Sequence, residues 1–242
     1  LGPGLAAGGY FFGAEGAIAM AALGLPLAAL SARRAHQAGA VAAPGDIAAG
    51  IAPREVIVAA LDPALRGTPP SRDTAVCFAI CLDDPHGLLS QHGRAGYDRV
   101  MAAFEDRIAG ALRDGDVIRQ LDGGRFAVAV AARLRIDLEA AIQIAARMQK
   151  RMSEPVSIDR TTVHVTASIG FCLPSRAPER TGAALLGAAE MALSEAWANG
   201  PGAIRAFTAD IRQRADQRDT MAAEVEAGFD NGEIVAFFQP QL

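Results

Sequence analysis

The fold of this chain is decided by the stretch Arg119-Gln120-Leu121-Asp122-Gly123-Gly124-Arg125-Phe126-Ala127-Val128-Ala129-Val130. It predicts two strands joined by a tight turn. Phe126, Val128 and Val130 alternate with small residues, which is typical of a strand that packs on a core. Asp122-Gly123-Gly124 predicts the turn, because glycine adopts positive φ without a Cβ clash. We therefore expect a β-hairpin here.

The composition around this hairpin indicates a globular protein. The chain has 242 residues, 51% of them apolar and 21% charged, so it can bury a sizeable core. A formal net charge of -4 provides no general attraction to nucleic acid, and no nucleic-acid partner is expected. The cysteines Cys77, Cys81 and Cys172 match no metal spacing, and we expect free thiols. The histidines show no paired spacing either, so no metal site is assigned to them.

The first 32 residues are strongly apolar. Residues 1–30 carry one charge, Glu15, and the basic pair Arg33-Arg34 follows. We interpret residues 1–32 as one or two membrane segments, cut at their N-terminal end, with the basic pair on the cytoplasmic side. The alternative is a buried hydrophobic hairpin of a soluble protein.

The remaining chain alternates strand-like and helix-like patterns. Residues 33–71 are expected to be a linker with a short helix that begins at Pro53. A buried central strand is predicted at 75–82, because the run is continuously apolar. Helices are predicted at 95–112, 137–152, 181–198 and 210–229, a strand pair at 156–158 and 163–172, and short strands at 203–207 and from 232. This order predicts an α/β domain.

Several strings in this order resemble the GGDEF domain, the diguanylate cyclase fold of bacterial second-messenger signalling. They are Thr166-Ala167-Ser168-Ile169-Gly170, the run Gly115–Leu121 that leads into the hairpin, and the helix that ends at Gly200. The tail Gly232–Leu242 resembles the opening strand of an EAL domain, the cyclic-di-GMP phosphodiesterase barrel. The resemblance implies an α/β (α+β) nucleotidyl-cyclase-like central sheet flanked by helices. It divides the chain into a GGDEF domain at 72–208, a connecting helix at 209–231 and a truncated EAL strand at 232–242.

The resemblance also implies where a cyclase site would lie, and those positions are degenerate. Joining two GTP molecules needs Mg²⁺, which takes carboxylate ligands. The implied first-strand ligand is Cys81, and Gly124 and Arg125 replace the acids of the hairpin tip. Leu89 and Ser90 replace the guanine-reading pair, and Trp197 replaces the triphosphate-binding lysine.

These replacements predict that the domain is not a diguanylate cyclase and holds no metal or cofactor. Mg²⁺ or Mn²⁺ is expected only for the EAL part, which lies beyond this chain. The alternative is a residual cyclase in which Asp83, Asp84 and Asp122 form a rearranged metal site.

One nucleotide-binding feature is retained. Arg113 and Asp116 match the Arg-x-x-Asp of the family's product-inhibition site, so the resemblance implies that they bind cyclic-di-GMP. Gln239 matches the glutamine that the EAL family places near the dinucleotide. The alternative for Arg113 and Asp116 is a charged turn between a helix and a strand.

The resulting hypothesis is an inactive GGDEF regulatory domain in a membrane-anchored cyclic-di-GMP signalling protein. Its partners would be cyclic-di-GMP or GTP, its own EAL domain and the membrane, and a homodimer is left open. It is expected at the inner membrane, with the GGDEF and EAL parts in the cytoplasm. The alternative is a receptor for cyclic-di-GMP or GTP without enzymatic activity.

Overall fold

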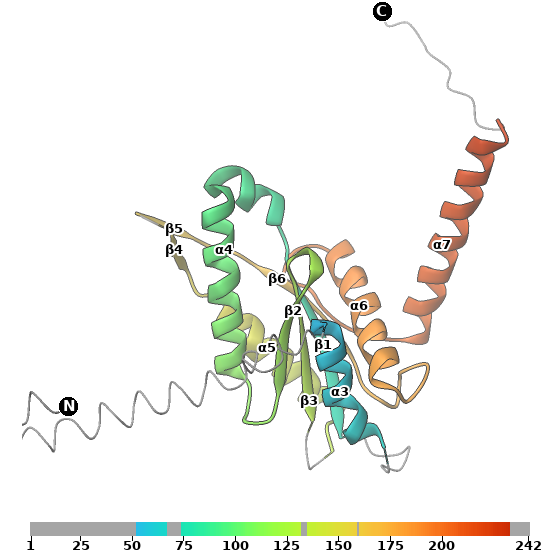
Figure 1. The fold of residues 1–242 in the computed structure, drawn as a ribbon, viewed down its shortest axis with the longest axis horizontal. Helices are drawn as coiled ribbons and strands as arrows, with labels where there is room; N and C mark the ends of the chain where they lie inside the picture. The colour runs from blue at the N-terminus through green and yellow to red at the C-terminus, as the bar shows by residue number, and fades with distance from the viewer. Residues whose placement is uncertain (1–51, 67–73, 132–134, 159, 233–242) are drawn as a thin grey trace, which may run out of the picture.

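The computed structural model describes residues 52–66, 74–131, 135–158 and 160–232 (Figure 1). The predicted membrane segments at 1–32, most of the linker and Gln239 lie outside the described residues. Within the described part, no helix is both long and apolar enough to cross a membrane.

The domain is built on a five-stranded sheet in the order β2-β3-β1-β6-β7. All neighbours are antiparallel except β6 and β7, which are parallel. The strands are β1 (Ala75–Leu82), β2 (Val117–Leu121), β3 (Arg125–Ala131), β6 (Ala167–Cys172) and β7 (Ile204–Ala206). The predicted hairpin is β2-β3, and the predicted central strand β1 lies in the middle of the sheet.

Helices cover both faces of this sheet (Figure 1). They are α3 (Pro53–Leu65), α4 (Pro85–Ala111), α5 (Leu138–Met152) and α6 (Gly182–Ala198). The helices α4 and α5 pack on one face, and α3 and α6 pack on the other. The structure therefore confirms an α+β sheet flanked by helices. It also places α3, which falls within the predicted linker, against the core, where Ile57 and Leu61 are fully buried.

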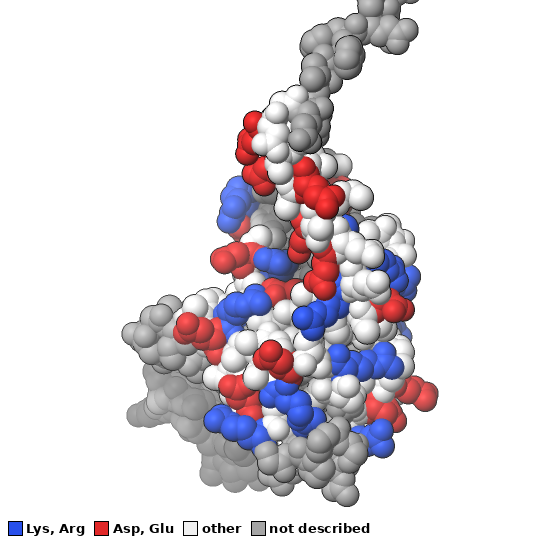
Figure 2. All heavy atoms as spheres, turned by 90° about the vertical axis from the view of Figure 1, so that its right-hand side faces the viewer, with Lys and Arg blue, Asp and Glu red and all other residues white. Residues whose placement is uncertain are grey.

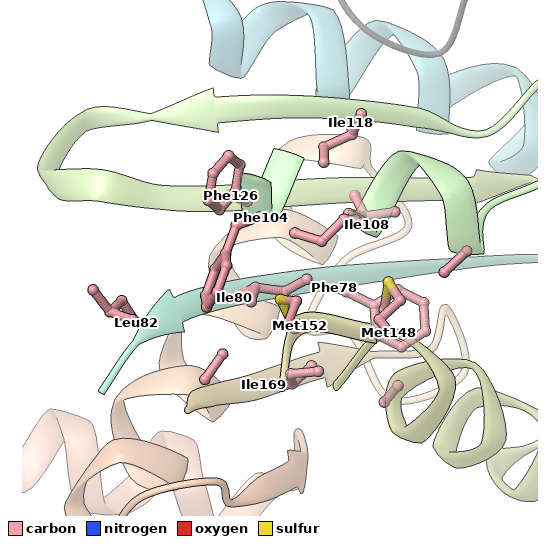
Figure 3. Packing of buried hydrophobic residues seen from close by; sticks show 14 of the residues in the cluster. Phe78, Ile80, Leu82, Phe104, Ile108, Ile118, Phe126, Met148, Met152 and Ile169 are labelled. Carbon is pink, nitrogen blue, oxygen red and sulfur yellow. The ribbon is translucent and has the colours of Figure 1, made fainter. Parts of the chain in front are cut away.

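The alternation of side-chain size along β1 explains the two layers. Phe78 and Ile80 point into the α4/α5 core, together with Phe104, Phe126 and Met148 (Figure 3). The residues between them are small and belong to the α3/α6 core. In β6 the smallest residue, Gly170, lies against α6: an added Cβ would come under 3.0 Å from the backbone of Leu193. The sheet and α6 are thus in near-backbone contact.

Two predicted elements differ in the structure. The helix predicted at 95–112 begins earlier, at Pro85, because Asp84 caps it through the Gly87 N–H, and it bends at Gly93 with φ 65°. The strand pair predicted at 156–158 and 163–172 is wrong. β4 (Val156–Ile158) pairs with β5 (Thr161–Val163) in a separate two-stranded sheet, and β6 joins the main sheet. A local apolar pattern does not specify which strand pairs with which.

The last described helix, α7 (Ala209–Asp230), projects away from the body of the domain (Figure 1). Its first half is tied to α6, because Arg214 donates to Glu195 at 2.6 Å. Its second half is exposed, and Figure 2 shows acidic side chains gathered along it. The predicted charged helix at 210–229 is therefore confirmed.

Candidate functional site

The hairpin tip is a single turn of 3-10 helix, Asp122–Gly124, between β2 and β3. Both glycines have positive φ, 72° at Gly123 and 71° at Gly124. A Cβ added at Gly124 would lie under 3.0 Å from the hydroxyl oxygen of Tyr97, whose ring is buried in α4. An acidic side chain at position 124 therefore needs a shift of Tyr97 as well as a strained backbone.

Arg125 follows the tip and makes contacts that suit a cation. Its Nε donates to the carbonyl oxygen of Asp122 at 3.1 Å. Its Nη1 lies 3.8 Å from Oε1 of Glu190 on α6. Both oxygens of Glu190 already accept hydrogen bonds from Arg54 of α3, at 2.8 and 2.6 Å. Two guanidinium groups thus share one carboxylate beside the hairpin tip.

Cys81 is the cross-strand neighbour of Arg125 in the β1-β3 pair. The structure therefore brings together the first strand and the hairpin tip, which the resemblance assigned to metal binding. Burial, helped by the negative charge of Asp83, raises the pKa of the Cys81 thiol to about 11. The thiol is neutral at physiological pH and is a poor ligand for Mg²⁺, which prefers oxygen.

Two of the nearby aspartates, Asp83 and Asp84, accept hydrogen bonds from the protein. Asp83 accepts a hydrogen bond from Ser168 Oγ at 2.5 Å and another from the Gly202 N–H at 2.8 Å. Asp84 caps α4 by accepting from the Gly87 N–H at 2.7 Å. Among the described residues, no group of three or more histidine, cysteine, aspartate or glutamate side chains is arranged to hold a metal ion. A glycine, a guanidinium and a neutral thiol at positions 124, 125 and 81 supply no oxygen ligand, so these three positions do not fit Mg²⁺.

Trp197, near the C-terminal end of α6, lines the same region. Its indole N–H donates to the carbonyl oxygen of Asp83 at 3.1 Å, and its side chain is 53% exposed. Cys81, Gly124, Arg125 and Trp197 line one cavity of about 220 Å³, together with Glu190. We call it the tip cavity.

Two other predicted positions do not contribute to the tip cavity. Leu89 is half-buried and packs against the α4/α5 core, and the Ser90 hydroxyl donates to the Gly87 carbonyl oxygen within α4. Sequence reasoning missed Glu190 and Arg54, which the structure adds to the site. The only local signal for Glu190 was its position as one of two acids, with Glu195, in a mainly apolar helix.

A second cavity, of about 570 Å³, lies beside the turn between α4 and β2. Arg113 and Asp116, the two residues that the resemblance assigned to cyclic-di-GMP binding, line it together with Arg135 and Arg147. Asp116 is buried and accepts a hydrogen bond from the Arg113 N–H at 2.8 Å. Burial raises the pKa of Asp116, and the Arg113 N–H and the charges of Arg113 and Arg147 oppose that shift. We call this the arginine cavity.

Comparison with known proteins shows which domains this chain resembles. The family model "Diguanylate cyclase, GGDEF domain" matches residues 45–202. The chain is 30% identical over 168 residues to the cyclic di-GMP phosphodiesterase NbdA of Pseudomonas aeruginosa. The aligned region covers 69% of this chain and 21% of that protein. It is 25% identical over 169 residues to MucR of the same organism, a bifunctional diguanylate cyclase/cyclic di-GMP phosphodiesterase, covering 68% of this chain and 24% of that protein.

A solved structure shows the same fold. The GGDEF domain of YfiN from Pseudomonas aeruginosa aligns with a TM-score of 0.61 and 27% identity, over 67% of this chain and 94% of that one. The chain spans about a fifth to a quarter of the length of the curated relatives it matches. Since the family model matches well over half of its residues, this chain belongs to the diguanylate cyclase GGDEF-domain family.

Proposed function

We propose that this chain is a catalytically inactive GGDEF regulatory domain of a membrane-anchored cyclic-di-GMP signalling protein. A downstream EAL domain would hydrolyse cyclic-di-GMP, using Mg²⁺ or Mn²⁺. Residues 1–32 would anchor the protein in the inner membrane, with the other parts in the cytoplasm. The observation that carries the loss of catalysis is the hairpin tip, where Gly124 and Arg125 take the places of acids.

The physical reason is the charge at the tip. Phosphoryl transfer between two GTP molecules depends on a divalent cation that neutralises the phosphates, and this cation needs oxygen ligands. The three positions that the resemblance assigns to metal ligands carry a glycine (Gly124), a guanidinium (Arg125) and a neutral thiol (Cys81). The rearranged site is disfavoured, because both carboxylate oxygens of Asp83 and one of those of Asp84 already accept hydrogen bonds from the protein.

The direct test is incubation of the full chain with GTP and either Mg²⁺ or Mn²⁺, followed by chromatography of the nucleotides. We expect no cyclic-di-GMP with either metal. An active GGDEF domain assayed in parallel shows that the conditions support turnover. Formation of product by this chain would refute the inactive assignment.

Regulation is tested in the longer protein that carries the downstream domain. Deletion of residues 72–208 should change the phosphodiesterase rate or its response to nucleotide. The relatives support this arrangement, because NbdA and MucR are both described as cyclic di-GMP phosphodiesterases and are much longer than this chain. Unchanged kinetics would count against a regulatory role.

A second candidate function is a cyclic-di-GMP receptor without enzymatic activity, and the arginine cavity favours it. Cyclic-di-GMP carries two phosphates, and Arg113, Arg135 and Arg147 supply three guanidinium groups to one cavity. Calorimetry with cyclic-di-GMP should show binding to the wild type and at least about tenfold weaker binding to Arg113→Ala. Arg151→Ala, an exposed arginine on α5 outside the cavity, is the control. Equal affinity for wild type and Arg113→Ala would exclude this site.

A further inference from the structure

The tip cavity has a flat aromatic wall. The Trp197 side chain is half-exposed, and its N–H bond to the Asp83 carbonyl oxygen restrains the orientation of the indole. Leu82, Pro85 and Leu193 also line the cavity and give it an apolar surface. An exposed, restrained indole beside aliphatic side chains is a platform on which a planar ring can stack.

The same cavity contains a cation that its acidic neighbour neutralises only in part. The Arg125 side chain is 44% exposed, and its Nη1 is beyond hydrogen-bond distance from Glu190. Glu190 is bonded at both oxygens by Arg54, so these three side chains carry a net charge of about +1. Asp83 is nearby, but its carboxylate bonds Ser168 and Gly202. A guanidinium in this state can bind a phosphate in a bidentate manner.

The size of the cavity limits the ligand. About 220 Å³ is below the roughly 300–1,000 Å³ of sites for drug-sized molecules. A single ring system with one phosphate suits this volume better than a dinucleotide does. The arginine cavity, at about 570 Å³, is more than twice as large.

Building on the proposed loss of catalysis, we propose that the tip cavity binds a planar aromatic ring that carries a phosphate group, and that it does so without a divalent cation. The ring stacks on Trp197 and the phosphate binds Arg125, which supplies the positive charge that a metal would otherwise bring. A divalent cation does not strengthen this binding, because it competes with Arg125 for the phosphate. The bound phosphate also competes with Glu190 for Arg125, and Glu190 is the residue that holds Arg54 of α3.

The test uses the intrinsic fluorescence of the full chain, in which Trp197 is the only tryptophan. Guanosine monophosphate is titrated in the presence of EDTA, in parallel with guanosine and with inorganic phosphate. We expect a saturable change in Trp197 emission with guanosine monophosphate, and at least about tenfold weaker binding of either part alone. Replacing EDTA with excess Mg²⁺ should leave the affinity unchanged or lower it.

Variants then assign the binding to the two groups. Arg125→Gln should weaken binding at least about tenfold, and Arg125→Lys should retain part of it because the charge remains. Glu190→Gln should strengthen binding, because it removes the competing carboxylate; a purely structural role for Glu190 would produce no gain. Arg113→Gln should have no effect, since Arg113 lies in the arginine cavity.

Circular dichroism of each variant establishes that it is folded, and the two Arg125 variants test the proposal should Glu190→Gln unfold. A linear, unsaturable fluorescence change, a requirement for Mg²⁺, or equal affinity of Arg125→Gln and wild type would overturn the proposal. Its failure is distinguishable from failure of the inactive assignment on which it rests: absent binding with no cyclase product refutes only the tip-cavity site, whereas cyclase product refutes the inactive assignment.

Discussion

The hairpin tip places two adjacent glycines in nearly the same backbone conformation, but only one of them faces a close neighbour. Gly123 has φ 72°, and a Cβ added there would meet only Arg125 Nε, at 3.9 Å. Gly124 has φ 71°, and its added Cβ would collide with the Tyr97 hydroxyl oxygen. Alanine substitution at the two positions therefore separates backbone strain from steric overlap.

The expected magnitudes follow from this difference. Gly123→Ala should lower the free energy of unfolding by about 1–2 kcal/mol, the cost of a left-handed conformation for a residue with a Cβ. Gly124→Ala should carry that cost and a further ~1–3 kcal/mol, because Tyr97 is buried and must move within a packed core. Tyr97→Phe removes the colliding oxygen. In the Gly124→Ala background it should therefore recover most of the additional loss.

The assay is guanidinium chloride unfolding followed by far-UV circular dichroism on wild type, the three single variants and the double variant Gly124→Ala/Tyr97→Phe. The double-mutant cycle isolates the interaction between positions 124 and 97. Gly123→Ala/Tyr97→Phe is the matched control and should show additive losses. Equal destabilisation by Gly123→Ala and Gly124→Ala, or a coupling near zero, would refute the reasoning that Tyr97 closes position 124 to an acid.

Three further predictions concern the sheet and the two cavities. Gly170→Ala in β6 should prevent or strongly impair folding, because the added Cβ would overlap the backbone of α6. Gly187→Ala, in α6 itself, has nothing within 4 Å of its added Cβ and should stabilise the fold by up to ~1 kcal/mol in the same denaturation assay. Burial raises the folded-state pKa of Asp116 above its unfolded value, so protonation of this carboxyl favours the folded state. The free energy of unfolding of wild type should therefore rise relative to that of Asp116→Asn as the pH falls from the raised pKa to the ordinary value of ~4. A relative gain in stability as the pH rises would contradict this. Asp83→Ala leaves the buried Ser168 hydroxyl and the Gly202 N–H without their acceptor, and it should lower the free energy of unfolding by about 1–3 kcal/mol per lost partner. If Mg²⁺ raised the unfolding midpoint of wild type but not that of Asp83→Ala, the result would instead indicate a metal site.

The local pattern of the sequence was sufficient for most of the elements. Asp122-Gly123-Gly124 predicted the hairpin, because a two-glycine turn is specified by backbone conformations that depend only on neighbouring residues. The continuous apolar run at 75–82 predicted the buried central strand. The prediction missed the first part of α4, from Pro85 to the bend at Gly93. This segment has its own N-cap, Asp84, but few apolar residues at regular helical spacing.

The composition of the candidate site depended on residues far apart in the chain. Once the resemblance is recognised, the sequence shows that Gly124 and Arg125 replace acids and that Trp197 replaces a lysine. The partners of these residues are not: Arg125 meets Glu190 and Gly124 meets Tyr97 only because α6 and α4 pack beside the hairpin.

The same distinction holds for the strands and the arginine cavity. The sequence by itself determined the hairpin, the buried strand and the glycine and arginine at positions 124 and 125, because these follow from the identity of consecutive residues. Only the tertiary structure paired β4 with β5 and brought Arg135 and Arg147 to Arg113 and Asp116. Contacts of this kind depend on how helices and strands pack around a shared core, which a local periodicity does not encode.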